Sequence, residues 1–232
     1  KTLFVATLIT TGIAMAVAGP IGLAAAIYLS EYASSRTRAL IKPVLEILAG
    51  VPSVVLGFFA LFFIAPEIIG RLNEDASAGS LAAAGVGVGL LTIPLVASVS
   101  EDAMKAVPLD LREAGAGLGA RKSVISSRVV FPAAISGIVA SFIVATSRAI
   151  GETMVVFIAG GAADSAGYTH SAFEGSLTMT AAMASLASGT DQVKGEGLTF
   201  QSLFFVGLLL FAITFMLNMV ADRFVRRVQE RY

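Results

Sequence analysis

The sequence of 232 residues contains no cysteine, no tryptophan and only one histidine. The absence of cysteine excludes disulfides, thiolate metal sites and cysteine nucleophiles. His170 has no second histidine beside which it could hold a metal, so we expect a surface residue. Charge is also scarce, because Asp, Glu, Lys and Arg make up 14% of the chain, against about 25% in ordinary soluble domains. The formal net charge of zero gives no electrostatic reason to expect a nucleic-acid partner.

Apolar residues dominate instead, at 56% of the composition and a mean hydropathy of +0.85. A membrane core about 30 Å thick requires roughly 20 helical residues to cross it. Five stretches are apolar enough for this, and they run over Leu3–Leu29, Val44–Ala65, Leu81–Val99, Pro132–Gly161 and Ser202–Val220. Gly19-Pro20 interrupts the first stretch, and Gly50-Val51-Pro52 breaks the second. Because a chain in lipid must satisfy its backbone hydrogen bonds internally, we predict an all-α, polytopic membrane bundle with five transmembrane helices.

The distribution of basic residues predicts the orientation of this bundle. Twelve basic residues lie in the first loop, the third loop and the C-terminal tail, whereas the other two loops hold only Arg71 and Lys194. We therefore expect the three basic regions in the cytoplasm, the N-terminus outside and the C-terminus inside. Residues 1–232 then form one transmembrane domain, and an N-terminus outside leaves room for a preceding helix that this sequence lacks.

The loop that follows the fourth stretch, Ala162 to Gln201, is long, acidic and rich in small residues. Within it, the segment Ser176–Ala187 is apolar but too short to cross a membrane. We expect this segment to form an interfacial or re-entrant helix on the outer side.

The third loop, Glu113 to Pro132, has the residue order of a helix–turn–helix. Glu113, Ala114 and Gly115 offer a small surface for close packing, Gly119 permits a turn with positive φ, and Pro132 suits the first turn of the next helix. The spacing resembles the EAA loop of ABC-transporter permeases, which docks into the nucleotide-binding subunit. Gly115 and Phe131 depart mildly from that pattern, which usually has Ala and Leu there.

The same loop superficially resembles a phosphate-binding loop, because glycines precede Arg121-Lys122-Ser123. A true P-loop has glycine directly before its lysine and a strand leading into it. Arg121 occupies that glycine position and no strand-like run precedes it. We therefore expect this chain to bind no ATP and no other cofactor.

Arg148 and Glu152 are charged residues inside the fourth apolar stretch, where a charge costs at least a few kcal/mol unless it is paired or meets water. If the helix continues through Gly151, their spacing places both on one face. One interpretation is then a structural ion pair within the helix. The other is an anion pathway, because a guanidinium fork suits a tetrahedral oxyanion. Phosphate keeps a proton near neutral pH, so it could donate a hydrogen bond to Glu152, whereas sulfate could not.

The run Arg148-Ala149-Ile150-Gly151-Glu152-Thr153-Met154 closely resembles a motif of phosphate-uptake ABC permeases, particularly the PstC type. The run from Leu48 to Gly57 (LAGVPSVVLG) resembles the same family, and the likeness covers nearly the whole chain. Sulfate and molybdate permeases share a similar loop and Arg…Gly-Glu element, so an oxyanion permease of that kind stays open as an alternative. The resemblance implies the type I ABC permease core in the cell membrane.

The resemblance also implies partners and pathway residues. The partners are a dimer of ABC ATPase subunits in the cytoplasm, a second permease of the PstA type, an extracytoplasmic phosphate-binding protein and membrane lipid. Thr153 lies in the shared motif. Pro52 and Ser53 restart a helix within the second stretch, where exposed N–H groups would attract an anion, although a simple proline kink explains them equally well.

Two other function classes are weighed against a transport subunit. An intramembrane enzyme needs a nucleophile with a base, or metal ligands, at membrane depth. No histidine, cysteine or aspartate pair lies in an apolar stretch, so we predict neither catalytic residues nor a metal site. A passive channel would not need an ATPase-docking loop, so the third loop argues against it.

Overall fold

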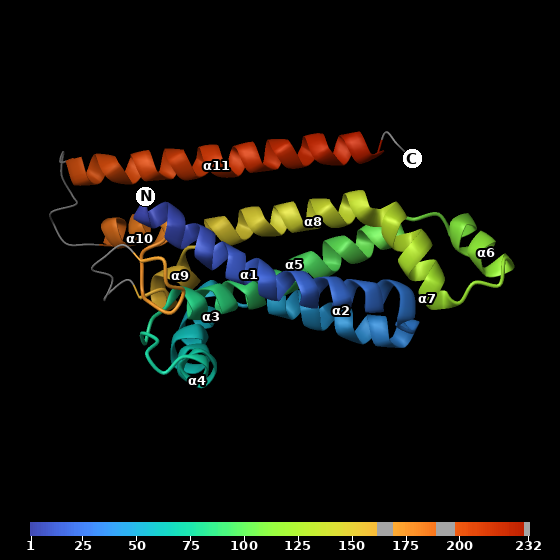
Figure 1. Cartoon of the computed structure of the whole chain (residues 1–232), viewed down its shortest axis with the longest axis horizontal. Helices are drawn as coiled ribbons and strands as arrows, with labels where there is room; N and C mark the ends of the chain where they lie inside the picture. The colour runs from blue at the N-terminus through green and yellow to red at the C-terminus, as the bar shows by residue number, and fades with distance from the viewer. Residues whose placement is uncertain (162–168, 189–197, 230–232) are drawn as a thin grey trace.

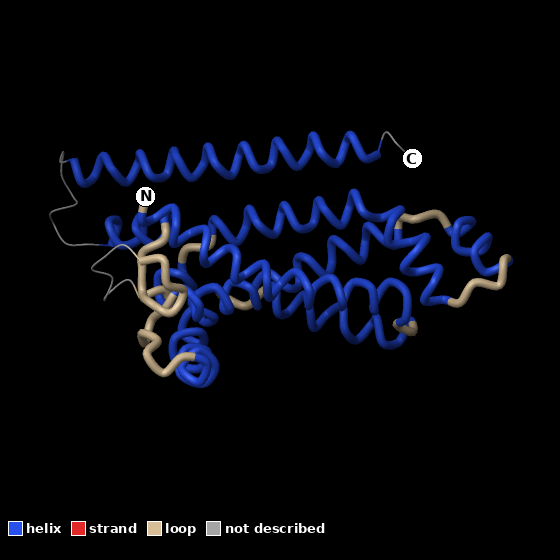
Figure 2. The backbone as a smooth tube through the Cα atoms, in the orientation of Figure 1, coloured by secondary structure: helices blue, strands red, loops and turns tan. Residues whose placement is uncertain are grey.

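The computed structural model describes residues 1–161, 169–188 and 198–229, and every regular element in these ranges is a helix (Figures 1 and 2). Five helical runs are long and apolar enough to cross a membrane: Thr2–Tyr32, Ser53–Leu72, Leu81–Lys105, Lys122–Gly151 and Gln201–Val220. The prediction of an all-α bundle with five membrane helices is confirmed. Lys194 and Arg231, which were counted for the orientation, lie outside the described residues.

Helix α5 (Leu81–Lys105) is the centre of the bundle. It packs against α1 (Thr2–Ile27), α8 (Phe131–Gly151) and the π-helical segment η2 (Ala60–Ile69). It is also the most buried of the five membrane-spanning runs. Because its surface is covered on several sides, α5 sets the positions of the helices that line the functional site.

Close contact between α1 and α5 depends on glycine. A Cβ atom on Gly85 would lie 2.7 Å from the Cβ of Ile13, and one on Gly22 would lie 2.7 Å from the Cβ of Val96. Such small residues let membrane helices approach until their backbones nearly touch, which is how they gain packing energy in lipid. The same pairs show that α1 and α5 run parallel, with the N-terminal ends of both at one end of the bundle.

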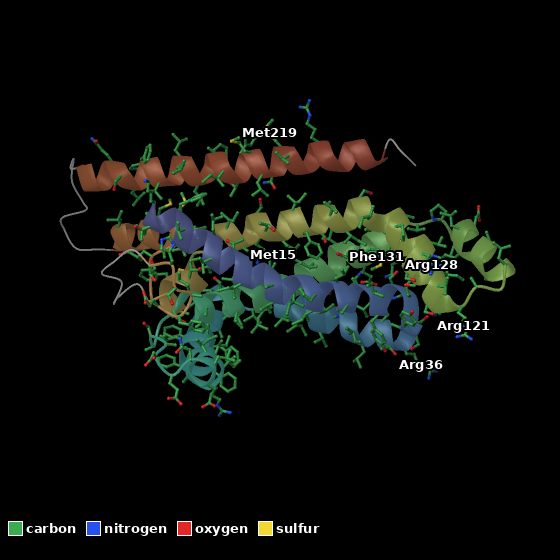
Figure 3. All side chains as sticks on the ribbon, viewed as in Figure 1. Met15, Arg36, Arg121, Arg128, Phe131 and Met219 are labelled. Atoms are coloured by element: carbon green, nitrogen blue, oxygen red, sulfur yellow. The ribbon has the colours of Figure 1, made fainter. Side chains whose placement is uncertain are left out.

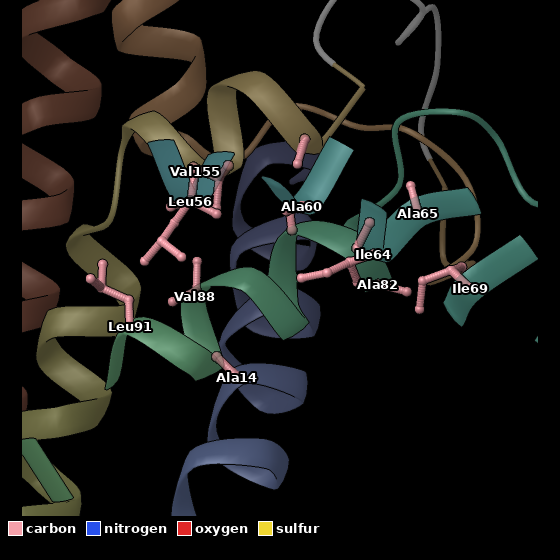
Figure 4. Packing of buried hydrophobic residues seen from close by; sticks show 14 of the residues in the cluster. Ala14, Leu56, Ala60, Ile64, Ala65, Ile69, Ala82, Val88, Leu91 and Val155 are labelled. Atoms are coloured by element: carbon pink, nitrogen blue, oxygen red, sulfur yellow. The ribbon is translucent and has the colours of Figure 1, made fainter. Parts of the chain in front are cut away.

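Apolar side chains from several helices form the core between α5 and its neighbours. Figure 4 shows this cluster, in which Leu56, Ala60 and Ile64 meet Ala82 and Val88 of α5, with Ala14 and Val155 beside them. The side chains are small or medium in size, as the short distances between these helices require.

The second predicted stretch, Val44–Ala65, is wrong in its first half. Helix α2 (Ser35–Ala49) is a separate helix without a buried residue, and it lies against α5 (Figure 1). The membrane-spanning run begins at Ser53 with α3 (Ser53–Phe59) and continues through η2 to α4 (Gly70–Leu72). The chain breaks before Ser53 because Pro52 has no N–H to donate and disfavours helical backbone at the residue before it.

The fourth predicted stretch, Pro132–Gly161, differs at both ends. The helical run begins at Lys122, with α7 (Lys122–Ile125) and the π-helical segment η3 (Ser126–Val130) leading into α8. It ends at Gly151, and a short helix α9 (Met154–Ala159) follows after a break. Pro132 therefore does not start the run, although it lies in the first turn of α8.

Prolines are accommodated inside helices more often than the sequence suggested. Pro20 lies within the continuous helix α1, so the predicted interruption at Gly19-Pro20 is wrong. Pro66 lies within η2, and Pro132 lies in the turn that follows η3. A proline ring clashes with the carbonyl four residues before it, and a π turn displaces that carbonyl. The wider turns thus let two of the prolines sit in unbroken membrane helices.

The two ends of the bundle differ in charge. Helix α6 (Leu109–Gly117) and α7 form one end, where Arg36, Arg121 and Arg128 also lie (Figure 3). We call this the basic end.

The opposite end carries α10 (Met179–Ser188), and we call it the α10 end. The segment Ser176–Ala187 was predicted to hold a short helix, and α10 confirms it with slightly shifted bounds. Helix α11 (Leu198–Gln229) runs from the α10 end to the basic end, so the chain begins and finishes at opposite ends (Figure 1). Which end faces the cytoplasm stays a prediction.

Candidate functional site

The predicted helix–turn–helix is present at the basic end. Gly119 has φ +75°, its N–H donates to the Ala116 carbonyl at 2.9 Å, and the N–H of Ala120 donates to the Gly115 carbonyl at 3.1 Å. This pair of hydrogen bonds closes the C-terminus of α6 in the manner of a Schellman motif, in which glycine takes the left-handed position. Gly119 therefore makes the turn that the sequence predicted.

Gly115 explains why α6 and α7 lie close together. A Cβ atom at this position would approach the Cγ1 of Ile125 to 3.1 Å, so a larger residue there would require the Ile125 side chain to shift. Glu113 and Ala114 are exposed, and so are the apolar side chains Leu109 and Leu118, at 70% and 90%. Exposed leucines on a short helix beside a polar residue form a surface suited to contact with another protein.

An ion pair that the sequence did not reveal attaches α6 to the bundle. Nη1 of Arg112 donates to both carboxylate oxygens of Glu31 at 2.7 Å, and Nη2 donates to the Met104 carbonyl at 2.8 Å. Glu31 lies in the π-helical segment η1 (Tyr28–Tyr32), which continues α1. Arg112 therefore links the helix–turn–helix to the ends of both α1 and α5.

Arg148 lines a cavity of about 210 Å³ between α2, α5 and α8. Pro94, Leu95 and Ser98 of α5 form one wall, and Lys42 and Glu46 of α2 form another. Glu101 lies in the same lining, where Arg38 at 3.6 Å and Lys105 form ion pairs with it. Arg148 itself forms no ion pair with a described residue and is exposed. A guanidinium in this state is available to an anion.

A second, more open hollow of about 470 Å³ continues from this cavity toward the basic end. Lys42 and Glu46 line both, and Arg38 and Lys105 join them in the second hollow. Glu46 is exposed and lines both spaces, because α2 folds back along α5, a contact that the sequence pattern does not encode.

Glu152 does not share a helix face with Arg148. Helix α8 ends at Gly151, and Glu152 has extended backbone (φ −66°, ψ 129°). Its Oε1 accepts hydrogen bonds from the N–H groups of Thr153 and Met154, both at 3.1 Å, and of Val155 at 3.4 Å. The structural interpretation, an ion pair within one helix, is therefore wrong, because the helix does not continue to Glu152.

Arg148 and Glu152 instead line different spaces. Arg148 lines the cavity that leads to the basic end, whereas Glu152 lines a narrow gap toward the α10 end. Thr153, whose hydroxyl donates to the Gly151 carbonyl at 3.3 Å, lies at the break between the two helices. The residues from Arg148 to Thr153 thus lie between the cavity and the narrow gap.

Pro52 and Ser53 restart a helix as predicted. Ser53 is the first residue of α3, and the Pro52 carbonyl accepts from the N–H of Val55 at 3.0 Å. Pro52 is exposed and Ser53 is half-buried. Neither residue lines the Arg148 cavity, which ends nearby at Ala49.

Comparison with known proteins places this architecture in a family. Residues 18–232 match the family described as "Binding-protein-dependent transport system inner membrane component". The chain belongs to this family. It is therefore a multi-pass component of the cell membrane and a transport subunit, not an enzyme.

Several curated members of the family are similar along nearly the whole chain. The protein named "Phosphate transport system permease protein PstC" from Mycobacterium leprae is 30% identical over 95% of this chain and 73% of its own length. Those of Mesorhizobium japonicum and Haemophilus influenzae are 32% and 33% identical, over 97% of this chain in both cases and over 72% and 75% of their own lengths.

Solved structures share the fold at lower identity. An inward-facing form of the MetNI methionine ABC transporter matches with a TM-score of 0.66 at 19% identity, covering 96% of this chain and 91% of that chain. A structure titled as an amino acid ABC transporter with histidines gives 0.68 at 17% identity, covering 97% and 92%. These likenesses support the type I ABC permease fold of this chain.

Proposed function

We propose that this chain is the permease subunit that passes inorganic phosphate across the cell membrane, in a binding-protein-dependent ABC importer. The proposal rests on the environment of Arg148. Its guanidinium lies in a membrane helix, lines a cavity, is exposed and forms no ion pair with a described residue. A charge at that depth marks a substrate route. The similarity to phosphate permeases over nearly the whole chain supports phosphate as that substrate.

Arg148 and the basic residues between it and the basic end form a route for an anion. Arg148 supplies a fork that can hold two oxygens of a tetrahedral anion. Arg38, Lys42 and Lys105 line the wider hollow beyond it, so cationic side chains continue toward the basic end, although each also pairs with a carboxylate and Glu46 lies beside them. Pro52, Ser53 and Thr153 lie at helix breaks beside the route and let its walls change shape.

The helix–turn–helix couples this route to ATP hydrolysis by separate ATPase subunits. Glu113, Ala114 and Gly115 lie on the helix that meets the ATPase, Gly119 makes its turn, and Pro132 follows where the loop joins α8. The exposed leucines of α6 provide apolar contact area for that partner. A second permease of the PstA type completes the translocation route, and an extracytoplasmic phosphate-binding protein delivers the anion at the α10 end.

Substitution of Arg148 tests the proposal. Because Arg148 forms no ion pair with a described residue, Arg148→Gln leaves no partner charge buried and the complex should assemble. We expect uptake of labelled phosphate into vesicles to fall at least tenfold, and Arg148→Lys to recover part of it, since a point charge lacks the two-pronged fork. Arg71→Gln is the control, because Arg71 is exposed and lies outside the cavity. Wild-type uptake by Arg148→Gln contradicts the proposed role.

A sulfate or molybdate permease is the second candidate. Addition of each anion in excess separates the two functions. A phosphate permease takes up labelled phosphate in the presence of sulfate, whereas a sulfate permease takes up labelled sulfate and ignores phosphate. If wild-type complex moves sulfate but no phosphate, the proposed substrate is wrong.

A further inference from the structure

A cluster of threonine hydroxyls lies beside Glu152 at the α10 end of the bundle. Thr7, Thr10 and Thr11 come from α1. Thr178 is the residue before α10, and Thr180 lies in the first turn of α10. All five are buried, and the most accessible of them is 6% exposed. Together with Glu152 and the last residues of α8, these threonines line the narrow gap described above.

Three of these hydroxyls have partners within the protein. Thr7 donates to the Leu3 carbonyl at 2.8 Å and accepts from the N–H of Met179 at 3.0 Å. Thr180 donates to the carbonyl of Glu152 at 2.7 Å, and Thr178 accepts from the N–H of Ala181 at 3.2 Å. These bonds tie α1, α10 and the end of α8 together.

The hydroxyls of Thr10 and Thr11 have no hydrogen-bond partner among the described residues. Their Oγ1 atoms are fully buried and form no hydrogen bond with a described residue, although each lines the gap. A threonine in a helix ordinarily donates to the carbonyl four residues earlier, as Thr92 does to Val88 at 2.7 Å. Buried hydroxyls without a partner are rare and point to a group that meets them in another state.

The gap is closed in this structure. No part of it is wide enough to hold a water molecule. The Arg148 cavity, which lies beside α8, is open at the same time. A transporter that opens one side at a time has one compartment closed while the other is open. The unpartnered hydroxyls can meet a ligand only in a state in which this gap is open.

We propose that this hydroxyl cluster binds protonated inorganic phosphate on the α10 side, before the anion reaches Arg148. The hydroxyls of Thr10 and Thr11 donate to phosphate oxygens. Glu152 accepts a hydrogen bond through Oε2 from the P–O–H group that phosphate carries near neutral pH, because the three backbone donors all bind Oε1. The carboxylate thereby favours phosphate over sulfate, which has no proton to give. This assignment rests on the proposed function.

The double variant Thr10→Val with Thr11→Val tests the assignment in the complete transporter. Valine has the shape of threonine without the hydroxyl. If the hydroxyls lack partners in the protein, the variant should unfold at the same temperature as wild type or higher. Phosphate uptake should nevertheless fall at least tenfold, because the anion loses two donors. Thr92→Val is the matched control, since its hydroxyl already has a partner and does not line the gap.

A second variant tests the selectivity. Glu152→Gln keeps an oxygen for the three backbone N–H groups but adds an amide donor in place of an acceptor. We expect phosphate uptake to fall and excess sulfate to compete more strongly than it does in wild type. Competition unchanged from wild type would overturn the role of Glu152.

The remaining outcomes separate this inference from the proposed function. If wild-type complex takes up no phosphate, the proposed function itself fails. If wild type takes up phosphate and the double valine variant matches it, the hydroxyls only line the gap and this inference alone is wrong. A double variant that unfolds at a lower temperature than wild type shows that the hydroxyls have internal partners, and it overturns the inference as well.

Discussion

Arg112 holds Glu31 across 81 residues of sequence, with Nη1 at 2.7 Å from each carboxylate oxygen. The Glu31 side chain is 4% exposed and that of Arg112 is 21% exposed. Ser30 adds a hydrogen bond to Oε1 at 2.9 Å, so the carboxylate has several donors. The pair connects the helix that we propose to meet the ATPase to the membrane helix α1. The pair therefore attaches α6 to the end of α1.

Removal of the Glu31 charge should weaken this connection. Glu31→Gln leaves the Arg112 guanidinium partly buried beside a neutral amide, and we expect the free energy of unfolding to fall by about 1–3 kcal/mol. Stimulation of ATP hydrolysis by the loaded binding protein should fall too, because α6 is no longer fixed to α1. Thermal unfolding of the purified complex and the stimulated hydrolysis rate measure the two effects.

The matched control is another Glu–Arg pair of this chain. Glu67 and Arg71 form an ion pair with side chains 48% and 76% exposed. Glu67→Gln should change stability by no more than about 0.5 kcal/mol, because water screens an exposed pair. Equal losses in Glu31→Gln and Glu67→Gln would show that the Arg112–Glu31 pair has no special structural role.

Gly119 should tolerate no β-branched residue. Its φ of +75° costs an L-residue about 1 kcal/mol or more, although an added Cβ would meet nothing within 4 Å. Gly119→Val should therefore insert into the membrane but co-purify with less ATPase. Gly117→Ala is the control, because this position is equally open and has no positive φ. Normal ATPase association by Gly119→Val would show that the turn is not required for docking.

The contact between α1 and α5 should depend on the absence of side chains. Gly85→Ala places a methyl group 2.7 Å from the Cβ of Ile13, and we expect a loss of about 1–3 kcal/mol as the helices move apart. Gly12→Ala on α1 meets nothing within 4 Å and should leave stability unchanged or slightly higher. The unfolding temperatures of the two variants measure the difference. A Gly85→Ala protein as stable as Gly12→Ala would mean that α1 and α5 are not held this closely.

The orientation can be tested by labelling, because the chain has no native cysteine. Ser123 is exposed at the basic end, and Ala78 is exposed in the bend before α5 at the other end. An impermeant thiol reagent should label Ala78→Cys in intact cells and Ser123→Cys only after the membrane is opened. Labelling of Ser123→Cys in intact cells would reverse the predicted topology.

Local properties of the sequence were sufficient for much of the fold. The five membrane helices follow from apolar length, and the turn at Gly119 follows from the conformational freedom of glycine. Helix boundaries at prolines were less predictable, since Pro52 lies at the break before α3 while Pro20 and Pro66 lie inside helices. Whether a proline breaks a membrane helix depends on the turns around it and on neighbouring helices, which the local sequence does not specify.

The sequence by itself determined that this is a helical membrane protein with a basic end, a helix–turn–helix loop and an arginine within an apolar run. Only the tertiary structure decided what that arginine meets. The end of α8 at Gly151 directs Arg148 and Glu152 to different compartments, and the folding of α2 along α5 brings Glu46 into the cavity. Thr10 likewise joins Thr178 only because α1 lies beside α10. Sequence spacing fixes neighbours along one helix, whereas a binding site is made by side chains from helices that packing brings together.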